Sequence, residues 1–257
     1  MSLFGRKRGD PRPMPLSERL YRRFILKYDG HYLITDLQLH AKRQSVDYII
    51  AHMSEAMIFE DRWALLRHAA SESTPTGLMI ECGVADGASL RHLANNSSRP
   101  FQGFDSFEGL PENWDGTFER KGKFSRGGSL PEVPGNVTLH KGWFDQTLPA
   151  FLATHPNDPV AMLHVDCDIY SSTVTIFREL GPRLVPGTII VFDEYFNYPN
   201  WQRHEFKAFQ EFIRDSGFSY RYLGFAQKNG HVGVRLGEKS NTARHEAERK
   251  LARWVPA

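Results

Sequence analysis

The sequence predicts an α/β fold in which helices cover both faces of a mostly parallel sheet. In the last two thirds of the chain, short apolar segments alternate with segments of helical periodicity, which is typical of parallel strands joined by helices. The apolar run 78–80 ends in Glu81 and in a turn at Gly83 that opens a helix. A second apolar run, 101–104, ends in Asp105. Together these observations indicate a ligand site at the carboxyl edge of the sheet.

Local periodicity predicts the individual elements. Strands are predicted at 78–81, 101–105, 137–140, 162–166, 188–193, 220–224 and 232–236. Helices are predicted near 87–95, 147–155, 171–183 and 202–216. The last two strands have no helix between them, and Asn229-Gly230 in their connection is a hairpin signal. The last strand should therefore be antiparallel to its neighbours.

Composition divides the chain into four segments. They are a disordered basic tail at 1–15, an N-terminal helical cap at 16–76, the α/β core at 77–237 and a charged C-terminal helix at 238–257. Within the cap, helices are predicted at 17–27, 36–53 and 60–70, with Asp36 as a capping residue.

The segment from Phe107 to Pro134 breaks the alternation, because glycines and prolines interrupt any periodicity. Long connections inside a compact domain are typically functional. This one leaves the strand that carries Asp105, so we predict a lid loop over the ligand site.

Charge and cysteine usage restrict the partners and the compartment. The net charge is +2, from 32 basic and 30 acidic residues, which does not favour a nucleic-acid partner. No apolar run approaches the length of a membrane span, so no membrane partner is expected.

Cys82 and Cys167 each stand beside an acid at the end of a predicted strand. Two buried free thiols predict a cytoplasmic protein.

The turn after the first core strand distinguishes between nucleotide cofactors. A dinucleotide fingerprint needs G-x-G-x-x-G, whereas this turn has Glu81 and glycines only at Gly83 and Gly87. Glu81 would repel a phosphate but could accept a hydrogen bond from a ligand ammonium group. This pattern argues against an NAD-dependent oxidoreductase and favours S-adenosylmethionine.

A set of longer motifs resembles one family. The motifs are Glu81-Cys82-Gly83-Val84-Ala85-Asp86-Gly87, Phe104-Asp105-Ser106-Phe107-Glu108-Gly109-Leu110-Pro111, Lys141-Gly142-Trp143-Phe144 with Thr147-Leu148-Pro149, Asp166-Cys167-Asp168-Ile169-Tyr170-Ser171-Ser172-Thr173 and Val191-Phe192-Asp193-Glu194-Tyr195. Over about residues 77–236, they resemble the class I S-adenosylmethionine-dependent methyltransferases of the macrocin and mycinamicin sugar O-methyltransferase type.

The resemblance implies a Rossmann-like methyltransferase sheet and S-adenosyl-L-methionine as cofactor. The implied cofactor-binding residues are Glu81, Gly83, Val84, Gly87, Ser89, Asp105, Ser106, Phe107, Gly142, Trp143 and Asp166. In the family, N-terminal helices cover the cofactor and contribute to oligomer contacts, so a homo-oligomer is an open alternative to a monomer.

Acids at two strand ends predict a divalent cation. Asp166, Asp193 and Glu194 supply oxygen ligands of the kind that Mg²⁺ prefers. By resemblance, Asp166 matches the first metal ligand of the family, and Asp193 and Glu194 stand where it has two adjacent ligands. Asp168 competes with Asp166 for this role, but its position favours capping the following helix.

The motifs predict an O-methyltransferase that acts through the metal held by Asp166 and Asp193. Its acceptor should be a hydroxyl on a small sugar or natural product. The general base is unassigned, with His140 and His204 as candidates. Two alternatives stay open: a metal-independent methyltransferase acting on a carboxylate or nitrogen, and a non-catalytic nucleotide-binding module.

Overall fold

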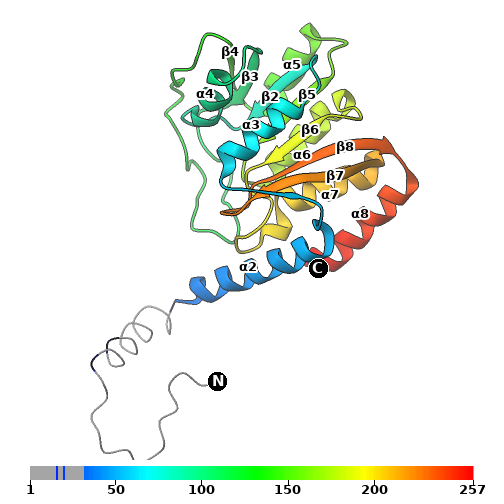
Figure 1. Cartoon of the computed structure of the whole chain (residues 1–257). Coiled ribbons are helices and arrows are strands. Elements are labelled where there is room, and N and C mark those ends of the chain that lie inside the picture. Colours follow the sequence, from blue (N-terminus) through cyan, green and yellow to red (C-terminus); the bar gives the residue numbers. More distant parts are fainter. Residues whose placement is uncertain (1–15, 17–19, 21–31, 257) are drawn as a thin grey trace, which may run out of the picture.

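The computed structural model describes residues 16, 20 and 32–256 (Figure 1). The tail predicted over 1–15 lies outside the described residues, as does the helix predicted over 17–27 except for Leu20. Within the described part, one sheet has the strand order β1-β7-β8-β6-β5-β2-β3-β4. Its strands are β1 Met57–Phe59, β2 Leu78–Cys82, β3 Phe101–Asp105, β4 Val137–Lys141, β5 Val160–Val165, β6 Ile189–Phe192, β7 Phe218–Ala226 and β8 Val232–Lys239.

The sheet is parallel except at β8, which pairs antiparallel with both β6 and β7. The prediction of an antiparallel last strand is confirmed. The connection between β7 and β8 is closed by a hydrogen bond from the Ala226 N–H to the His231 carbonyl at 3.1 Å. Asn229 takes the left-handed conformation there, with φ 62°, as expected for an Asn-Gly turn.

Strand β1 was not predicted. It pairs parallel with β7, placing Met57 opposite Gly224. The next helix is α3 (Arg62–Glu72), which begins after Asp61, whose side chain accepts a hydrogen bond from the Ala64 N–H at 2.9 Å. Both elements precede the boundary predicted at residue 76, yet they pack on the same sheet as the core strands.

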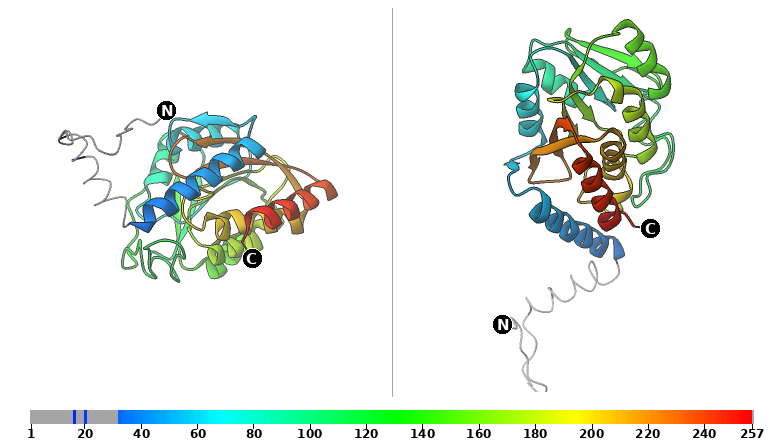
Figure 2. Two further views of the ribbon diagram at one scale, coloured as in Figure 1. Left: turned by 90° about the horizontal axis from the view of Figure 1, so that it is seen from below. Right: turned by 90° about the vertical axis from the view of Figure 1, so that its right-hand side faces the viewer.

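Helices cover both faces of the sheet (Figures 1 and 2). Met79 and Ile80, neighbours in β2, belong to two different hydrophobic clusters, because successive strand residues point to opposite faces. Helices α3 and α4 (Ala88–Asn95) pack on the Met79 side. On the Ile80 side lie α5 (Phe144–Thr154), α6 (Tyr170–Leu180) and α7 (Glu205–Ser216), with short 3-10 turns at Gly181–Arg183 and Trp201–Arg203.

Helices α2 (Leu33–His52) and α8 (Asn241–Trp254) meet near their C-terminal ends at one end of the molecule (Figure 1). The Tyr48 and Trp254 rings are in edge contact, with centroids 5.4 Å apart. Helix α2 begins after Tyr32, without a side-chain cap, so Asp36 lies in its first turn and the predicted cap is wrong. Next to the contact, the hydroxyl groups of four buried or partly buried tyrosines meet Gln210 and Lys250 in one hydrogen-bonded cluster: Tyr48, Tyr195, Tyr220 and Tyr222.

The segment predicted as a lid contains no helix or strand over 107–134. It folds back on itself through hydrogen bonds from the Leu110 N–H to the Lys123 carbonyl and from the Gly122 N–H to the Leu110 carbonyl. Leu110 and Trp114 are buried against Ile169, which precedes α6. The segment is therefore anchored to the carboxyl edge of the sheet.

Two findings concern the predicted compartment. Cys82 and Cys167 are both buried and free. Within the described chain, no helix combines the length and the hydropathy that crossing a bilayer requires.

Candidate active site

A cavity of about 270 Å³ opens at the carboxyl ends of β2, β3, β4, β5 and β6. Parallel strands end at the same edge of a sheet, so residues far apart in the sequence meet there. Its wall includes Gly83, Val84, Ser89, Asp105, Ser106, Gly142, Trp143, Asp166, Asp168, Asp193 and Glu194. The lid segment adds Gly109, Leu110, Pro111 and Phe124, and α3 adds Arg62.

Gly83 allows the ends of β2 and β5 to approach each other closely. Its φ is +96°, and a Cβ atom there would lie 1.6 Å from the Asp166 carbonyl oxygen. Only glycine fits this combination of conformation and contact. Gly87 ends the turn with φ +79° as the N-cap of α4, and it does not line the cavity.

Asp105 binds the backbone of the glycine turn. One carboxylate oxygen accepts hydrogen bonds from the N–H groups of Val84 and Ala85, both at 2.8 Å. The other accepts one from the Phe107 N–H at 2.7 Å. The acid that ends β3 thus orients the turn that follows β2, while Phe107 itself stays off the cavity wall.

Glu81 lies behind the wall. Its side chain is 1% exposed. One carboxylate oxygen accepts a hydrogen bond from the Ser89 hydroxyl at 2.8 Å, and the other lies 2.7 Å from His164 Nδ1. Ser89 does line the cavity, so Glu81 is one side chain away from any ligand there.

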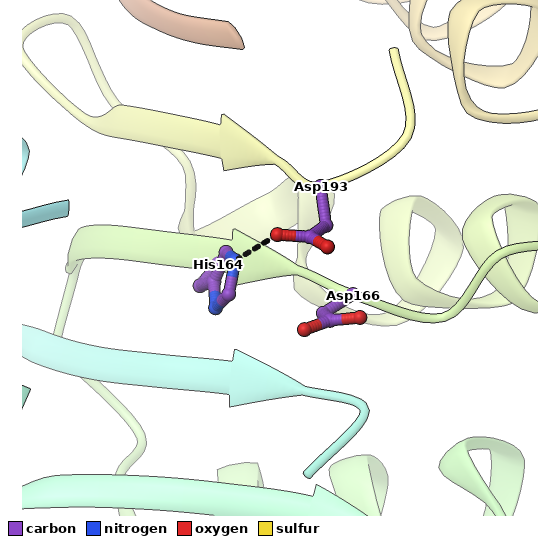
Figure 3. A group of neighbouring side chains, drawn as sticks. All are labelled: His164, Asp166 and Asp193. Atoms are coloured by element: carbon purple, nitrogen blue, oxygen red, sulfur yellow. Dashed lines mark ion pairs between the residues drawn. The ribbon is translucent and has the colours of Figure 1, made fainter. Parts of the chain in front are cut away.

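Three side chains form the best-placed group for a metal ion: His164, Asp166 and Asp193 (Figure 3). One ligand atom from each lies within 4.8 Å of the others. Burial, together with the Asp193 carboxylate, raises the pKa of Asp166 well above its ordinary range. Two carboxylates held this close favour a bound cation.

Asp193 is surrounded by cationic or potentially cationic groups. Arg62 Nη1 lies 3.2 Å from its Oδ2, and His231 Nδ1 lies 2.8 Å from its Oδ1. His164 Nε2 lies 3.8 Å from the same Oδ1. Burial raises the pKa of Asp193, but the two imidazoles outweigh burial and hold it well below its ordinary range. Each carboxylate oxygen of Asp193 thus has a basic neighbour.

The other two acids have different surroundings. Glu194 lines the cavity, and its Oε2 is buried with no hydrogen-bond partner among the described residues. It is not part of the three-residue group. Asp168 also lines the cavity and takes the left-handed conformation, with φ +67°. Burial, with Asp193 nearby, raises the pKa of Asp168 to about 7.

The structure puts the two candidate histidines outside the cavity wall. His140 stacks on Phe104 and lies 2.8 Å from the Gln102 side-chain oxygen. His204 Nε2 lies 2.9 Å from the Asp115 carbonyl.

Sequence analysis missed three residues of the site: Arg62, His164 and His231. A signal for His164 existed, because it precedes Asp166 by two residues in a strand and shares its face. Arg62 and His231 come from other parts of the chain and have no local pattern.

A family model matches the middle part of the chain. Residues 80–195 match the model of a family described as a methyltransferase domain. The structure is similar to that of the calicheamicin methyltransferase CalS11, with a TM-score of 0.55, 21% identity, and coverage of 93% of this chain and 100% of the other. The predicted methyltransferase-type sheet is thus confirmed.

Two curated relatives are similar in sequence. The chain is 30% identical over 146 residues to the 8-demethyl-8-(2,3-dimethoxy-alpha-L-rhamnosyl)-tetracenomycin-C 4'-O-methyltransferase of Streptomyces olivaceus, covering 46% of this chain and 53% of the relative. It is 36% identical over 72 residues to the mycinamicin III 3''-O-methyltransferase of Micromonospora griseorubida, covering 28% and 26%. The chain thus spans about half of one relative and a quarter of the other. These matches confirm the resemblance to sugar O-methyltransferases.

Proposed function

We propose that this chain, which carries a methyltransferase domain over residues 80–195, is an S-adenosylmethionine-dependent O-methyltransferase. It uses a divalent cation, Mg²⁺, and methylates a hydroxyl of a small sugar or natural-product acceptor. The observation that carries the proposal is one cavity that joins the glycine turn, Asp105 and the Asp166–Asp193 pair. The two buried free cysteines suit a cytoplasmic location.

The residues fit S-adenosylmethionine. A cradle of backbone at Gly83 and Val84 opens into the cavity beside Ser89 at the start of α4, as nucleotide sites in such sheets do. Asp105 keeps acceptor capacity beside its three backbone bonds, so it can also accept a hydrogen bond from a ribose hydroxyl. Gly142 and Trp143 line the cavity, and the Trp143 ring offers an aromatic wall for the adenine. The Gly142 N–H is already bonded to the Asp105 carbonyl at 2.9 Å. Glu81 acts on the methionine ammonium through Ser89, whose hydroxyl donates to its carboxylate.

The donor set also fits a hard cation. Asp166 and Asp193 would hold it, with the unpartnered Oε2 of Glu194 as a further oxygen nearby. When bound, such a cation lowers the pKa of an acceptor hydroxyl and aligns it with the methyl group. Arg62 has to leave Asp193 for this to happen, because its Nη1 already pairs with Oδ2 of that carboxylate.

We assign Asp168 as the group that accepts the acceptor's proton. It lies on the cavity wall two residues after Asp166, and the candidate histidines do not reach that wall. Leu110, Pro111 and Phe124 of the lid segment supply an apolar wall that excludes water from the reacting oxygen. The tetracenomycin relative is named for a rhamnosyl substrate, which supports a glycosylated acceptor here.

The test is methyl transfer from labelled S-adenosylmethionine to a panel of glycosylated metabolites, free sugars, catechols and carboxylic acids. Transfer to a hydroxyl should stop with a chelator and return with Mg²⁺. Asp193→Asn should lose transfer but keep cofactor binding in calorimetry without Mg²⁺, whereas Asp166→Asn should lose transfer and also weaken cofactor binding. Asp145→Asn, an exposed acid on α5, is the control. Full transfer in chelator, or transfer confined to carboxylates, would contradict the proposal.

A further inference from the structure

We infer that His164 is a positioning residue shared by the cofactor and cation sites, and that it makes the two ligands bind cooperatively. The inference deepens the proposed function and rests on it. In this inference, Nδ1 of the ring serves the cofactor site and Nε2 serves the cation site.

The His164 ring lies between two carboxylates. Its Nδ1 is 2.7 Å from Glu81 Oε2, a hydrogen-bond distance. Its Nε2 faces Asp193 Oδ1 at 3.8 Å (Figure 3) and has no hydrogen-bond partner among the described residues. The ring is 1% exposed, so water does not offer Nε2 an easy alternative.

Each carboxylate belongs to a different site. Glu81 is connected to the cavity through Ser89 at the first turn of α4, where the methionine end of the cofactor is expected. Asp193 belongs to the group that could hold a metal ion. An imidazole is rigid, so orienting one nitrogen orients the other. The ring therefore transmits the position of Glu81 to Asp193.

The sign of the coupling follows from preorganisation. A cofactor that immobilises Glu81 also immobilises the ring, which then presents Nε2 to Asp193 in a fixed direction. The Asp193 carboxylate is then already oriented when the cation binds, so binding costs less conformational freedom. Linkage requires the reverse effect to be equally large. Each ligand should thus raise the affinity of the other, by about 5-fold or more.

The chain offers matched controls, because other residues touch only one of the two carboxylates. Ser89 contacts Glu81, whereas His231 contacts Asp193 at 2.8 Å. Ser89→Ala should weaken cofactor binding and reduce the coupling, because Ser89 connects Glu81 to the cavity. His231→Gln should weaken cation binding and leave the coupling in place, because it touches Asp193 alone.

Two substitutions of His164 separate its nitrogens. His164→Asn keeps an amide close to the place of Nδ1 and removes Nε2. His164→Gln keeps a group near Nε2 and removes the Nδ1 contact. We expect His164→Asn to keep cofactor affinity and to lose cation affinity by about 10- to 100-fold, as for other residues that orient metal ligands. His164→Gln should show the reverse, and both should lose the coupling.

The experiment is isothermal titration calorimetry of S-adenosylhomocysteine with and without Mg²⁺, and of Mg²⁺ with and without S-adenosylhomocysteine. It uses the full chain, with circular dichroism to confirm folding. Wild-type protein that binds neither ligand would contradict the proposed function itself. Wild-type protein that binds both independently would overturn only the role of His164, even if the variants did not fold. Coupling that persists in folded His164→Asn and His164→Gln would overturn it as well.

Discussion

The carboxylate of Asp105 accepts a hydrogen bond from the backbone N–H of Val84 at 2.8 Å, so the end of β3 holds the turn that follows β2. This bond links two separate motifs of the sequence.

Asp105→Ala should therefore weaken both the fold and the cofactor site. It leaves the N–H groups of Val84, Ala85 and Phe107 without their acceptor. Each bond to a charged acceptor contributes about 1.5–3 kcal/mol, so we expect at least ~10-fold weaker S-adenosylhomocysteine binding by calorimetry and a lower melting temperature. Asp105→Asn keeps one acceptor oxygen and should lose less. Equal effects of the two variants would contradict this account.

Gly83→Ala should be far more damaging than Gly122→Ala. Both glycines have positive φ, +96° and +83°, so both alanines carry backbone strain of about 1–2 kcal/mol. Only at Gly83 does the new Cβ meet the backbone, 1.6 Å from the Asp166 carbonyl oxygen; at Gly122 nothing lies within 4 Å. Urea unfolding should give a loss above ~4 kcal/mol at Gly83, or no folded protein. Similar losses at both positions would show that strain alone matters.

Arg62→Gln should lower the Mg²⁺ concentration needed for activity, if the cation binds Asp193. Arg62 pairs with that carboxylate at 3.2 Å, with 29% of its side chain exposed. A pair this exposed contributes about 0.2–1 kcal/mol, which corresponds to a shift of up to about 5-fold. A Mg²⁺ titration of the initial rate measures it. Arg67→Gln, on the exposed side of the same helix, should cause no shift, and an increased Mg²⁺ requirement in Arg62→Gln would refute the competition.

His52 should make the protein less stable in acid. Burial, assisted by Lys250 and Arg253 and opposed by Glu246, lowers the pKa of His52 from 6.5 to about 4. Between these values the unfolded chain binds a proton that the folded protein does not, so the free energy of unfolding falls as the pH falls from about 6.5 to about 4. Chemical denaturation at several pH values measures how the free energy of unfolding depends on pH. His52→Phe should reduce this slope by an amount that corresponds to at most one bound proton.

The control for the acid effect is Ile50→Phe, at an exposed position of the same helix α2. It introduces a phenylalanine without removing a titratable group, so it should keep the slope of the wild type. An unchanged slope in His52→Phe would mean that other groups cause the acid sensitivity.

The sequence predicted the strands from β2 to β8 to within a few residues, because buried strands are apolar runs bounded by turn residues. Strand β1 was not predicted, because it has only three residues, and two of them, Met57 and Ile58, are exposed. Its pairing with β7 comes from tertiary structure, which no local pattern records.

The candidate site was predictable in part. Strand ends are visible in the sequence, so Asp105, Asp166 and Asp193 could be assigned to one edge of the sheet. The contacts of Asp193 with Arg62 and His231 could not, because these residues are brought together by α3 and by the β7–β8 turn. The position of Glu81 behind Ser89 likewise depends on side-chain packing.

The contact between Tyr48 and Trp254 has a consequence for synthesis on the ribosome. Helix α8 contacts the tyrosine cluster at two points. The Trp254 ring packs against Tyr48, and Lys250 donates a hydrogen bond to the Tyr220 hydroxyl at 2.7 Å. The chain is made from its N-terminal end, so α8 (Asn241–Trp254) follows all eight described strands of the sheet. Before α8 is made, the Tyr48 ring lacks its contact with Trp254 and the Tyr220 hydroxyl lacks its bond from Lys250. The docking of α8 therefore completes the cluster after the strands have been synthesised.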